Sequence, residues 1–228
     1  MINVRVPLGV NVLDEIRVTG GRPLRGNISV QGSKNAALPM MAASLLHRGI
    51  SVLRDCPKIA DVYCMEEILK ELGAVSWWKG KDLYLDCSRA DKTEIPGEKT
   101  GKMRSSVILL GAMLGRNGKG AMGYPGGCVI GKRPIDLHIY ALRSLGAAVR
   151  EGEEDISASC VRLKGAKVCF PKSSVGATEQ GILAAVLAEG ESMLRPDARH
   201  RLPADGYENH HQGIFSKESD RTIPGEPR

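Results

Sequence analysis

The sequence predicts an α/β domain built from repeats of about 70 residues. Three stretches resemble one another: GSKNAALPMMAASLLHRGISVLRDCP from Gly32, KMRSSVILLGAMLGRNGKGAMGYPG from Lys102, and KSSVGATEQGILAAVLAEGESMLRP from Lys172. The spacing between their starts is 70 residues both times. Because each stretch combines one helical run with one β-like run, we expect three units that pack with their helices inward.

Each repeat opens with small polar residues and an Ala/Leu-rich run of helical length. Ser, Thr and Asn near the start of such a run can cap the free N–H groups of a helix. The runs are apolar all round, which is typical of buried helices. Gly49, Gly118 and Gly190 follow the runs, and we expect them to end the helices, as glycine does at the C′ position.

The first two repeats continue with a second, shared pattern. Met65–Cys87 and Leu137–Leu163 both contain a helical run, the letters LGA, a strand, a turn and another strand. In the first of them Ile68, Leu69 and Leu72 form the apolar face of an amphipathic helix. A complete repeat is therefore predicted to run strand–helix–strand–helix–strand–strand.

The third repeat departs from this order after Arg195. The remaining residues are polar, contain scattered Pro, Gly, Asp and His, and show no period, so disorder is favoured there. Two interpretations fit: an ordinary flexible tail, or a longer protein that was truncated or shifted into another reading frame near Leu194. The expected organisation is an N-terminal segment over 1–30, an incomplete domain over 31–194 and an aberrant tail over 195–228.

Composition excludes several classes of protein. The 228 residues carry a net charge of +6, which suits an anionic partner, but aromatic residues make up only 4%, so a protein that stacks nucleic-acid bases is not expected. No segment approaches the roughly 20 apolar residues of a membrane span, and no signal peptide is evident. The six cysteines form no CxxC pair, so no zinc site is expected. Reduced thiols in the cytoplasm are the simplest interpretation. We expect Cys87, Cys160 and Cys169, which lie in strand-like runs, to be small buried hydrophobic residues.

The loop GYPGGCVIGKRP places Cys128 among glycines. The thiolate is the reactive form of cysteine, and nearby cations such as Lys132 and Arg133 lower the pKa of a thiol. A glycine-rich loop with one ionisable tip suits a lid that delivers a proton. The alternative is a surface turn that contains an incidental cysteine.

Cationic helix starts recur at equal repeat positions. The residues that share this arrangement are Lys34 and Asn35, Lys102 and Arg104, and Lys172, Ser173, Ser174 and Gly176. A lysine beside a helix N-terminus forms an anion site, although each could also be a capped helix with a solvated lysine. Asp136 and His138 could bind a polar ligand, or Asp136 could simply cap the helix that follows. Three such starts should cluster at one end of a pseudo-symmetric domain, which favours a single pocket for a polyanion.

The motifs GSKNAALP, MRSS, PGGCVIGKRPIDLH and KSSVGATE resemble the enolpyruvyl transferase family, over about Ile16 to Leu194. The string with Cys128 is specific to the branch that acts on UDP-N-acetylglucosamine. The resemblance implies an inside-out α/β barrel. It also implies transfer of the enolpyruvyl group of phosphoenolpyruvate to the 3-hydroxyl of UDP-N-acetylglucosamine, the first committed step of peptidoglycan synthesis. No metal or other cofactor is implied.

The resemblance also assigns roles to single residues. Cys128 matches the proton donor and fosfomycin target, and Lys34 and Arg133 match cations that bind phosphoenolpyruvate. The residues that match substrate contacts, mainly to the sugar nucleotide, are Asn35, Arg104, Arg133, Pro134, Ile135, Asp136, Leu137, His138, Lys172, Ser173, Ser174, Val175 and Gly176.

One departure from the family pattern concerns length. The family chain has a second domain, which supplies a base for the sugar hydroxyl and further arginines, and on which residues up to about Val30 would pack. We therefore expect the chain alone to be inactive, with a separate chain carrying the second half as a candidate partner. Two further functions stay open: a non-catalytic fragment that binds the UDP-sugar, and an enzyme of the enolpyruvylshikimate phosphate synthase type.

Overall fold

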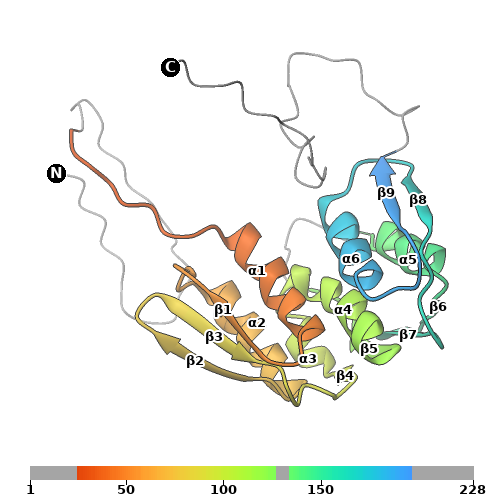
Figure 1. Cartoon of the computed structure of the whole chain (residues 1–228), viewed down its shortest axis with the longest axis horizontal. Helices are drawn as coiled ribbons and strands as arrows, with labels where there is room; N and C mark the ends of the chain where they lie inside the picture. Colours follow the sequence, from red (N-terminus) through yellow and green to blue (C-terminus); the bar gives the residue numbers. More distant parts are fainter. Residues whose placement is uncertain (1–24, 127–133, 197–228) are drawn as a thin grey trace, which may run out of the picture. The chain divides into compact units, whose positions relative to one another are not determined.

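The computed structural model describes residues 25–126 and 134–196, and Figure 1 shows their arrangement. The chain divides into two units, Met1–Gln31 and Gly32–Arg228. In the first unit, residues 25–31 form neither helix nor strand, and Ile28 and Val30 are exposed. All the described helices and strands belong to the second unit. Of the residues 195–228, for which we expected disorder, Arg195 and Pro196 belong to a strand, and the others lie outside the described residues.

The second repeat contains the complete predicted order. Its elements are β4 (Glu94–Ile95), the short helix α3 (Gly97–Thr100), the 3-10 helix η2 (Arg104–Val107) with α4 (Ile108–Asn117), β5 (Lys119–Gly123), α5 (Asp136–Ser144), β6 (Ala148–Glu151) and β7 (Asp155–Ser159). The strands form one sheet in the order β4-β5-β7-β6. The β4–β5 pair is parallel and the other two pairs are antiparallel.

The first and third repeats contain parts of the same order among the described residues. The first has α1 (Lys34–Ala43), η1 (Ser44–Leu46), β1 (Ile50–Leu53), α2 (Ala60–Glu71), β2 (Val75–Lys79) and β3 (Asp82–Asp86), with the sheet order β1-β3-β2. The third has β8 (Lys167–Phe170), α6 (Val175–Ala185) and β9 (Met193–Pro196), with β8 and β9 parallel. The domain end that we expected after Leu194 falls inside β9.

The helices α1, α4 and α6 lie together between the sheets and run in the same direction (Figure 1). Two glycines of α4 allow α6 to approach closely: a Cβ on Gly111 would lie 2.5 Å from the carbonyl oxygen of Gln180, and one on Gly115 would lie 3.1 Å from that of Leu183. The contacting residues have increasing numbers in both helices, from Gly111 to Gly115 and from Gln180 to Leu183, so α4 and α6 are parallel.

The last turn of α4 also contacts the end of the first repeat's helical segment. In the last turn of α4, Arg116 donates a hydrogen bond of 2.6 Å from Nη1 to the carbonyl oxygen of Leu45 in η1. The C-terminal ends of all three helical segments therefore lie together, and their N-terminal ends point toward the opposite end of the bundle.

The predicted amphipathic helix and one predicted helix end are confirmed. Ile68 and Leu69 on the inner face of α2, and Leu72 directly after the helix, are fully buried. Gly118 ends α4 in the left-handed conformation with φ +69°, and its N–H donates to the carbonyl oxygen of Leu114.

The helix ends predicted at Gly49 and Gly190 are wrong. The α-helix of α1 gives way at Ser44, whose hydroxyl donates to the carbonyl oxygen of Met41 and so competes with the helical ladder. After α6, Glu189 exchanges backbone hydrogen bonds with residues 163–165, which draws the chain out of the helix before Gly190.

The cysteine prediction is confirmed for one residue only. Cys87 is fully buried, whereas Cys160 and Cys169 are half-buried. Among the described residues, no helix combines the length and the apolar character that crossing a membrane requires.

Candidate functional site

The candidate site is the end of the bundle where the three parallel helices begin. Lys34 is the first residue of α1, Arg104 is the first residue of η2, and Ser174 precedes α6. Only Ser174 caps its helix with its side chain, accepting a hydrogen bond of 3.4 Å from the N–H of Ala177. The residues before α1, η2 and α5 make no side-chain cap. Uncapped N–H groups and the positive ends of helix dipoles attract anions.

Lys34 belongs to the first-repeat part of this end. Its Nζ lies 2.7 Å from Oδ2 of Asp61 in the first turn of α2, and both side chains are about half-exposed. Asn35, the next residue of α1, is exposed. The ammonium of Lys34 is therefore held at the start of α1 but is open to solvent.

Arg104 connects the start of η2 to the segment that leads into α5. Its Nη2 donates a hydrogen bond of 3.0 Å to the carbonyl oxygen of Pro134. On the preceding side, the N–H of Gly126 donates to the carbonyl oxygen of Thr100 at 3.2 Å, and a Cβ on Gly126 would overlap the backbone of Gly101. Residues 126 and 134 are thus both anchored beside η2. The predicted Cys128 and Arg133 fall outside the described residues.

His138 forms the buried junction between α5 and α6. Its Nδ1 lies within hydrogen-bonding distance of Oε1 of Gln180. Since an amide oxygen can only accept, Nδ1 carries the proton in this pair. A Cβ on Gly176 would lie 3.1 Å from Cε1 of His138, so only glycine leaves the ring undisturbed.

The charge of His138 follows from its surroundings. Burial lowers the pKa of His138 and the nearby charge of Arg104 lowers it further, while the hydrogen bond that His138 donates to Gln180 and the charge of Asp136 oppose this shift. The imidazole is therefore neutral near pH 7, with Nε2 as an acceptor beside Gly176.

The interpretation of Asp136 as a helix cap is wrong. Asp136 is already the first helical residue of α5, and Ile135 precedes the helix without a side-chain cap. In the first turn, the carboxylate of Asp136 interacts favourably with the positive end of the helix dipole, which does not require it to act as a cap.

The other predicted residues divide by burial. The side chain of Leu137 packs in a small apolar cluster with Val168, Phe170 and Ala177. Its contribution at this junction is therefore structural. Lys172 and Ser173 are exposed in the turn before α6, and Val175 is exposed at the start of that helix.

Two residues of this end were not found by sequence reasoning. Gln180 lies four residues after Gly176 and so on the same face of α6, a spacing that could have identified it. Its Nε2 is buried without a hydrogen-bond partner in the described structure. Asp61, which pairs with Lys34, gave no signal in the sequence.

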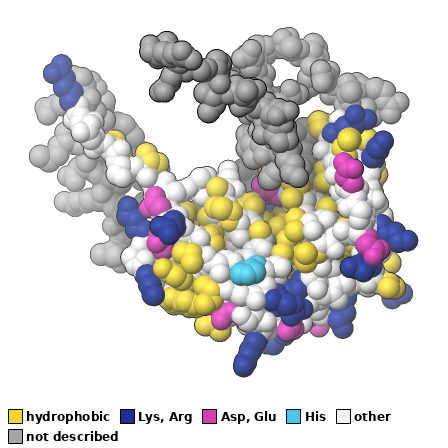
Figure 2. All heavy atoms as spheres, viewed as in Figure 1, with side chains coloured by type: hydrophobic (Ala, Val, Ile, Leu, Met, Phe, Trp, Pro, Cys, Tyr) yellow, Lys and Arg dark blue, Asp and Glu magenta, His cyan; other side chains and the backbone are white. Residues whose placement is uncertain are grey.

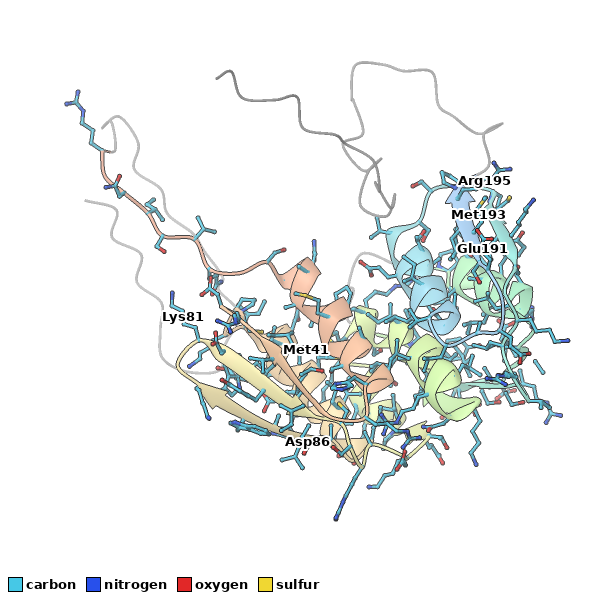
Figure 3. All side chains as sticks on the ribbon, viewed as in Figure 1. Met41, Lys81, Asp86, Glu191, Met193 and Arg195 are labelled. Atoms are coloured by element: carbon cyan, nitrogen blue, oxygen red, sulfur yellow. The ribbon has the colours of Figure 1, made fainter. Side chains whose placement is uncertain are left out.

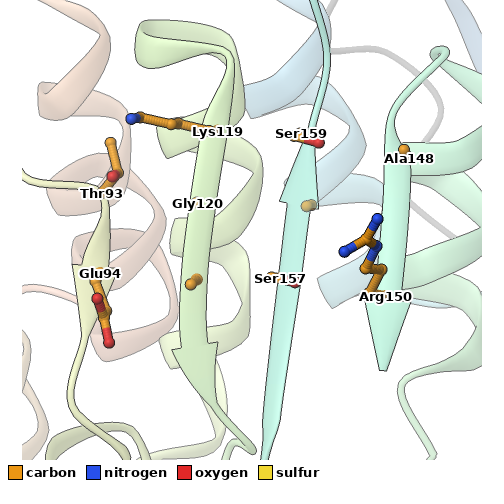
Figure 4. Close-up of a pocket in the computed structure, with 10 residues that line it drawn as sticks. Thr93, Glu94, Lys119, Gly120, Ala148, Arg150, Ser157 and Ser159 are labelled. Carbon is orange, nitrogen blue, oxygen red and sulfur yellow. The ribbon is translucent and has the colours of Figure 1, made fainter. Parts of the chain in front are cut away.

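A separate cavity of about 370 Å³ lies across the strands β4, β5, β7 and β6 (Figure 4). Charged and hydroxyl side chains such as Lys119, Arg150 and Ser157 line it. None of the sequence-predicted residues belongs to it. No group of His, Cys, Asp or Glu side chains suited to a metal ion occurs in the described part of the chain.

Comparison with known proteins matches most of the chain. A family model described as EPSP synthase (3-phosphoshikimate 1-carboxyvinyltransferase) matches residues 18–203. A UDP-N-acetylglucosamine 1-carboxyvinyltransferase 2 of Caldanaerobacter subterraneus subsp. tengcongensis is 40% identical over 187 residues, which is 82% of this chain and 45% of the relative. The corresponding enzyme of Geobacter metallireducens is 39% identical with the same coverage. The chain thus spans about half the length of the curated relatives it matches.

Solved structures support the fold. The enolpyruvyl transferase NikO from Streptomyces tendae matches with a TM-score of 0.65 at 21% identity, over 77% of this chain and 41% of that chain. An EPSP synthase from Acinetobacter baumannii matches with a TM-score of 0.61 at 20% identity, over 75% of this chain and 40% of that chain.

Proposed function

Since the chain belongs to the EPSP synthase family of enolpyruvyl transferases, we propose that it is the sugar-nucleotide-binding portion of a UDP-N-acetylglucosamine 1-carboxyvinyltransferase. The complete activity transfers the enolpyruvyl group of phosphoenolpyruvate to the 3-hydroxyl of UDP-N-acetylglucosamine and so makes a peptidoglycan precursor in the cytoplasm. Curated relatives at about 40% identity carry this name, which supports the choice of substrates.

The junction of Arg104, His138 and Gly176 carries this proposal. These residues come from η2, α5 and α6, and they meet where three helices begin. Helix starts and an arginine suit a diphosphate. The neutral imidazole of His138, held by its hydrogen bond to Gln180, adds a polar and uncharged side chain to this junction. We therefore assign the nucleotide end of the substrate to this junction.

The reacting end is proposed to lie toward Lys34 and the segment between Gly126 and Pro134. Cys128 donates a proton to the methylene carbon of phosphoenolpyruvate, and the neighbouring carbon becomes electron-poor while Lys34 and Arg133 hold the phosphate. The sugar oxygen then bonds to that carbon, and its proton passes to a base in the second domain of the family. Loss of a methyl proton and of phosphate finally gives the enol ether.

Calorimetric titration with UDP-N-acetylglucosamine, together with an assay for phosphate release, tests the proposal. We expect saturable binding without phosphate release, because the base belongs to the part of the relatives beyond the matched stretch. Arg104→Met should weaken binding at least about tenfold, since a hydrogen bond from a charged group contributes about 1.5–3 kcal/mol. Arg143→Met is the matched control, because Arg143 is half-exposed and pairs with Glu151.

Two results would overturn the proposal. The first is the absence of heat at millimolar UDP-N-acetylglucosamine, and the second is equal weakening by the two arginine variants. Phosphate release that Cys128→Ala abolishes would refute the expectation that the chain needs a second half. The EPSP synthase alternative is favoured by the name of the matching family model, and binding of shikimate 3-phosphate in competition with the UDP-sugar would support it.

A further inference from the structure

The third repeat leaves an apolar helix face uncovered in the described part of the chain. Along α6 and the residue after it, Val175, Ile182 and Val186 are 70%, 38% and 59% exposed. Their spacing of seven and four residues places them on one stripe of a helix, which also includes the half-buried Glu179. A surface helix is normally polar on that side. By contrast α4, which holds the same place in the second repeat, is buried on every side from Ile108 to Leu114.

The neighbouring helix α1 continues this apolar surface. Met40 is 51% exposed, and Ala36 is exposed one turn before it. The helices α1 and α6 pack against each other, and Figure 2 shows hydrophobic side chains gathered over both of them. We refer to Ala36, Met40, Val175, Ile182 and Val186 as the α1–α6 face.

A strand edge is unpaired next to this face. β9, on which Met193 and Arg195 are labelled in Figure 3, pairs with β8 on one side. No described strand pairs with its other side. In the second repeat the equivalent strand β5 is paired on both sides, with β4 and with β7. An unpaired edge presents N–H and C=O groups to which another strand can add.

The second repeat shows what covers these two features in a complete unit. There the segment α5–β6–β7 follows β5, and β7 adds antiparallel to the edge of β5. The apolar side of α5 packs against α6, and Leu137 and Ala177 belong to the same apolar cluster there. In this chain the residues after β9 are polar and carry no helical period, whereas the curated relatives continue beyond the matched stretch.

From this comparison we propose that the α1–α6 face and the free edge of β9 bind a helix followed by a β-hairpin, supplied by another polypeptide of the same family. The apolar side of the amphipathic helix covers Met40, Ile182 and Val186. The last strand of the hairpin adds antiparallel to β9. This interaction completes the third repeat in the way that α5–β6–β7 completes the second, and it does not depend on the proposed catalytic activity.

Fluorescence anisotropy of a labelled synthetic peptide tests this proposal with the full chain. The peptide copies the Caldanaerobacter relative directly after the stretch matched by this chain, and has the length of Asp136–Ser159. We expect saturable binding. The double variant Ile182→Lys, Val186→Lys should weaken it at least about tenfold, because charged groups at the centre of an interface lose their hydration on binding.

The matched control adds the same charge elsewhere. Val75 and Val161 are also strongly exposed but belong to β2 and to the turn after β7, so the variant Val75→Lys, Val161→Lys should bind within about twofold of the unchanged chain. Circular dichroism checks that both variants fold. Absence of saturable binding, or equal weakening by the control, overturns the proposal. So does light scattering that shows a dimer which only Ile182→Lys, Val186→Lys dissociates, because the face then binds a second copy.

Discussion

The close crossing of α4 and α6 predicts that Gly111→Ala destabilises the domain. A Cβ at residue 111 would lie 2.5 Å from the carbonyl oxygen of Gln180 and 2.9 Å from its Cγ. The first of these neighbours is backbone, which a rotamer change cannot move. Ordinary van der Waals contact begins near 3.4 Å, so the two helices must separate by about 0.9 Å or α6 must deform.

Two opposing terms set the magnitude. Forcing an extra carbon into a packed core costs about 1–3 kcal/mol. Alanine is favoured over glycine inside a helix by up to about 1 kcal/mol, which offsets part of that cost. We therefore expect the free energy of unfolding to fall by about 1–2 kcal/mol, which lowers the melting temperature of a domain of this size by about 2–8 °C.

Urea unfolding followed by circular dichroism measures this change. Gly97→Ala is the matched control, because its Cβ would lie 3.7 Å from the nearest atom, the Cα of Gly123, at ordinary contact distance. The control should leave stability unchanged or raise it slightly. If Gly111→Ala is as stable as the unchanged chain, α4 and α6 are not in the contact described. The inference that Arg104 and Ser174 lie at the same end of the bundle then has no support.

Two further predictions concern a titrating group and a buried cation. Burial lowers the pKa of His138 in the folded chain, so below its ordinary value of about 6.5 the unfolded chain binds more protons. Stability should then fall with decreasing pH, by at most about 1.4 kcal/mol per pH unit, until the pH passes the lowered pKa. Urea unfolding of His138→Asn at pH 7.5 and pH 5 should show a smaller loss, and an equal loss would contradict this. Arg116, whose side chain is 2% exposed, donates to the carbonyl oxygens of Leu45 and Cys87. Arg116→Met should cost about 2–4 kcal/mol, against less than about 1 kcal/mol for the half-exposed Arg143→Met, measured as a thermal shift.

The order of elements could be predicted from the sequence because the same pattern of helices and strands occurs in more than one repeat. The buried helix runs and the LGA turns recur at fixed positions, so each copy supports the interpretation of the others. Helix ends could not be predicted as well. Gly118 sits directly after its helix, but the ends of α1 and α6 depend on the hydroxyl of Ser44 and on the pairing of Glu189 with residues 163–165. Such tertiary hydrogen bonds leave no local pattern.

The candidate site shows the same division. Equal spacing of Lys34, Arg104 and Ser174 was enough to predict that helix starts gather at one end of the domain. The spacing could not predict which partners these residues take. Asp61 and Gln180 lie far along the chain from Lys34 and His138, and only the packing of helices from different segments brings them together. The roles of Cys128 and Arg133 stay predictions, because these residues lie outside the described part of the chain.

The proposed nucleotide site therefore rests on contacts between repeats rather than within one. Arg104 and His138 belong to the second repeat, whereas Gly176 and Gln180 belong to the third. A change that separates α4 from α6 moves His138 and Gln180, which stay packed together between α5 and α6, away from Arg104 in the η2–α4 segment without touching a ligand. Gly111→Ala should consequently weaken binding of UDP-N-acetylglucosamine as well as stability, while Arg116→Met, at the opposite end of the bundle, should lower stability and leave the affinity of the folded chain unchanged. Equal effects of both variants on affinity would show that the junction is not the binding site.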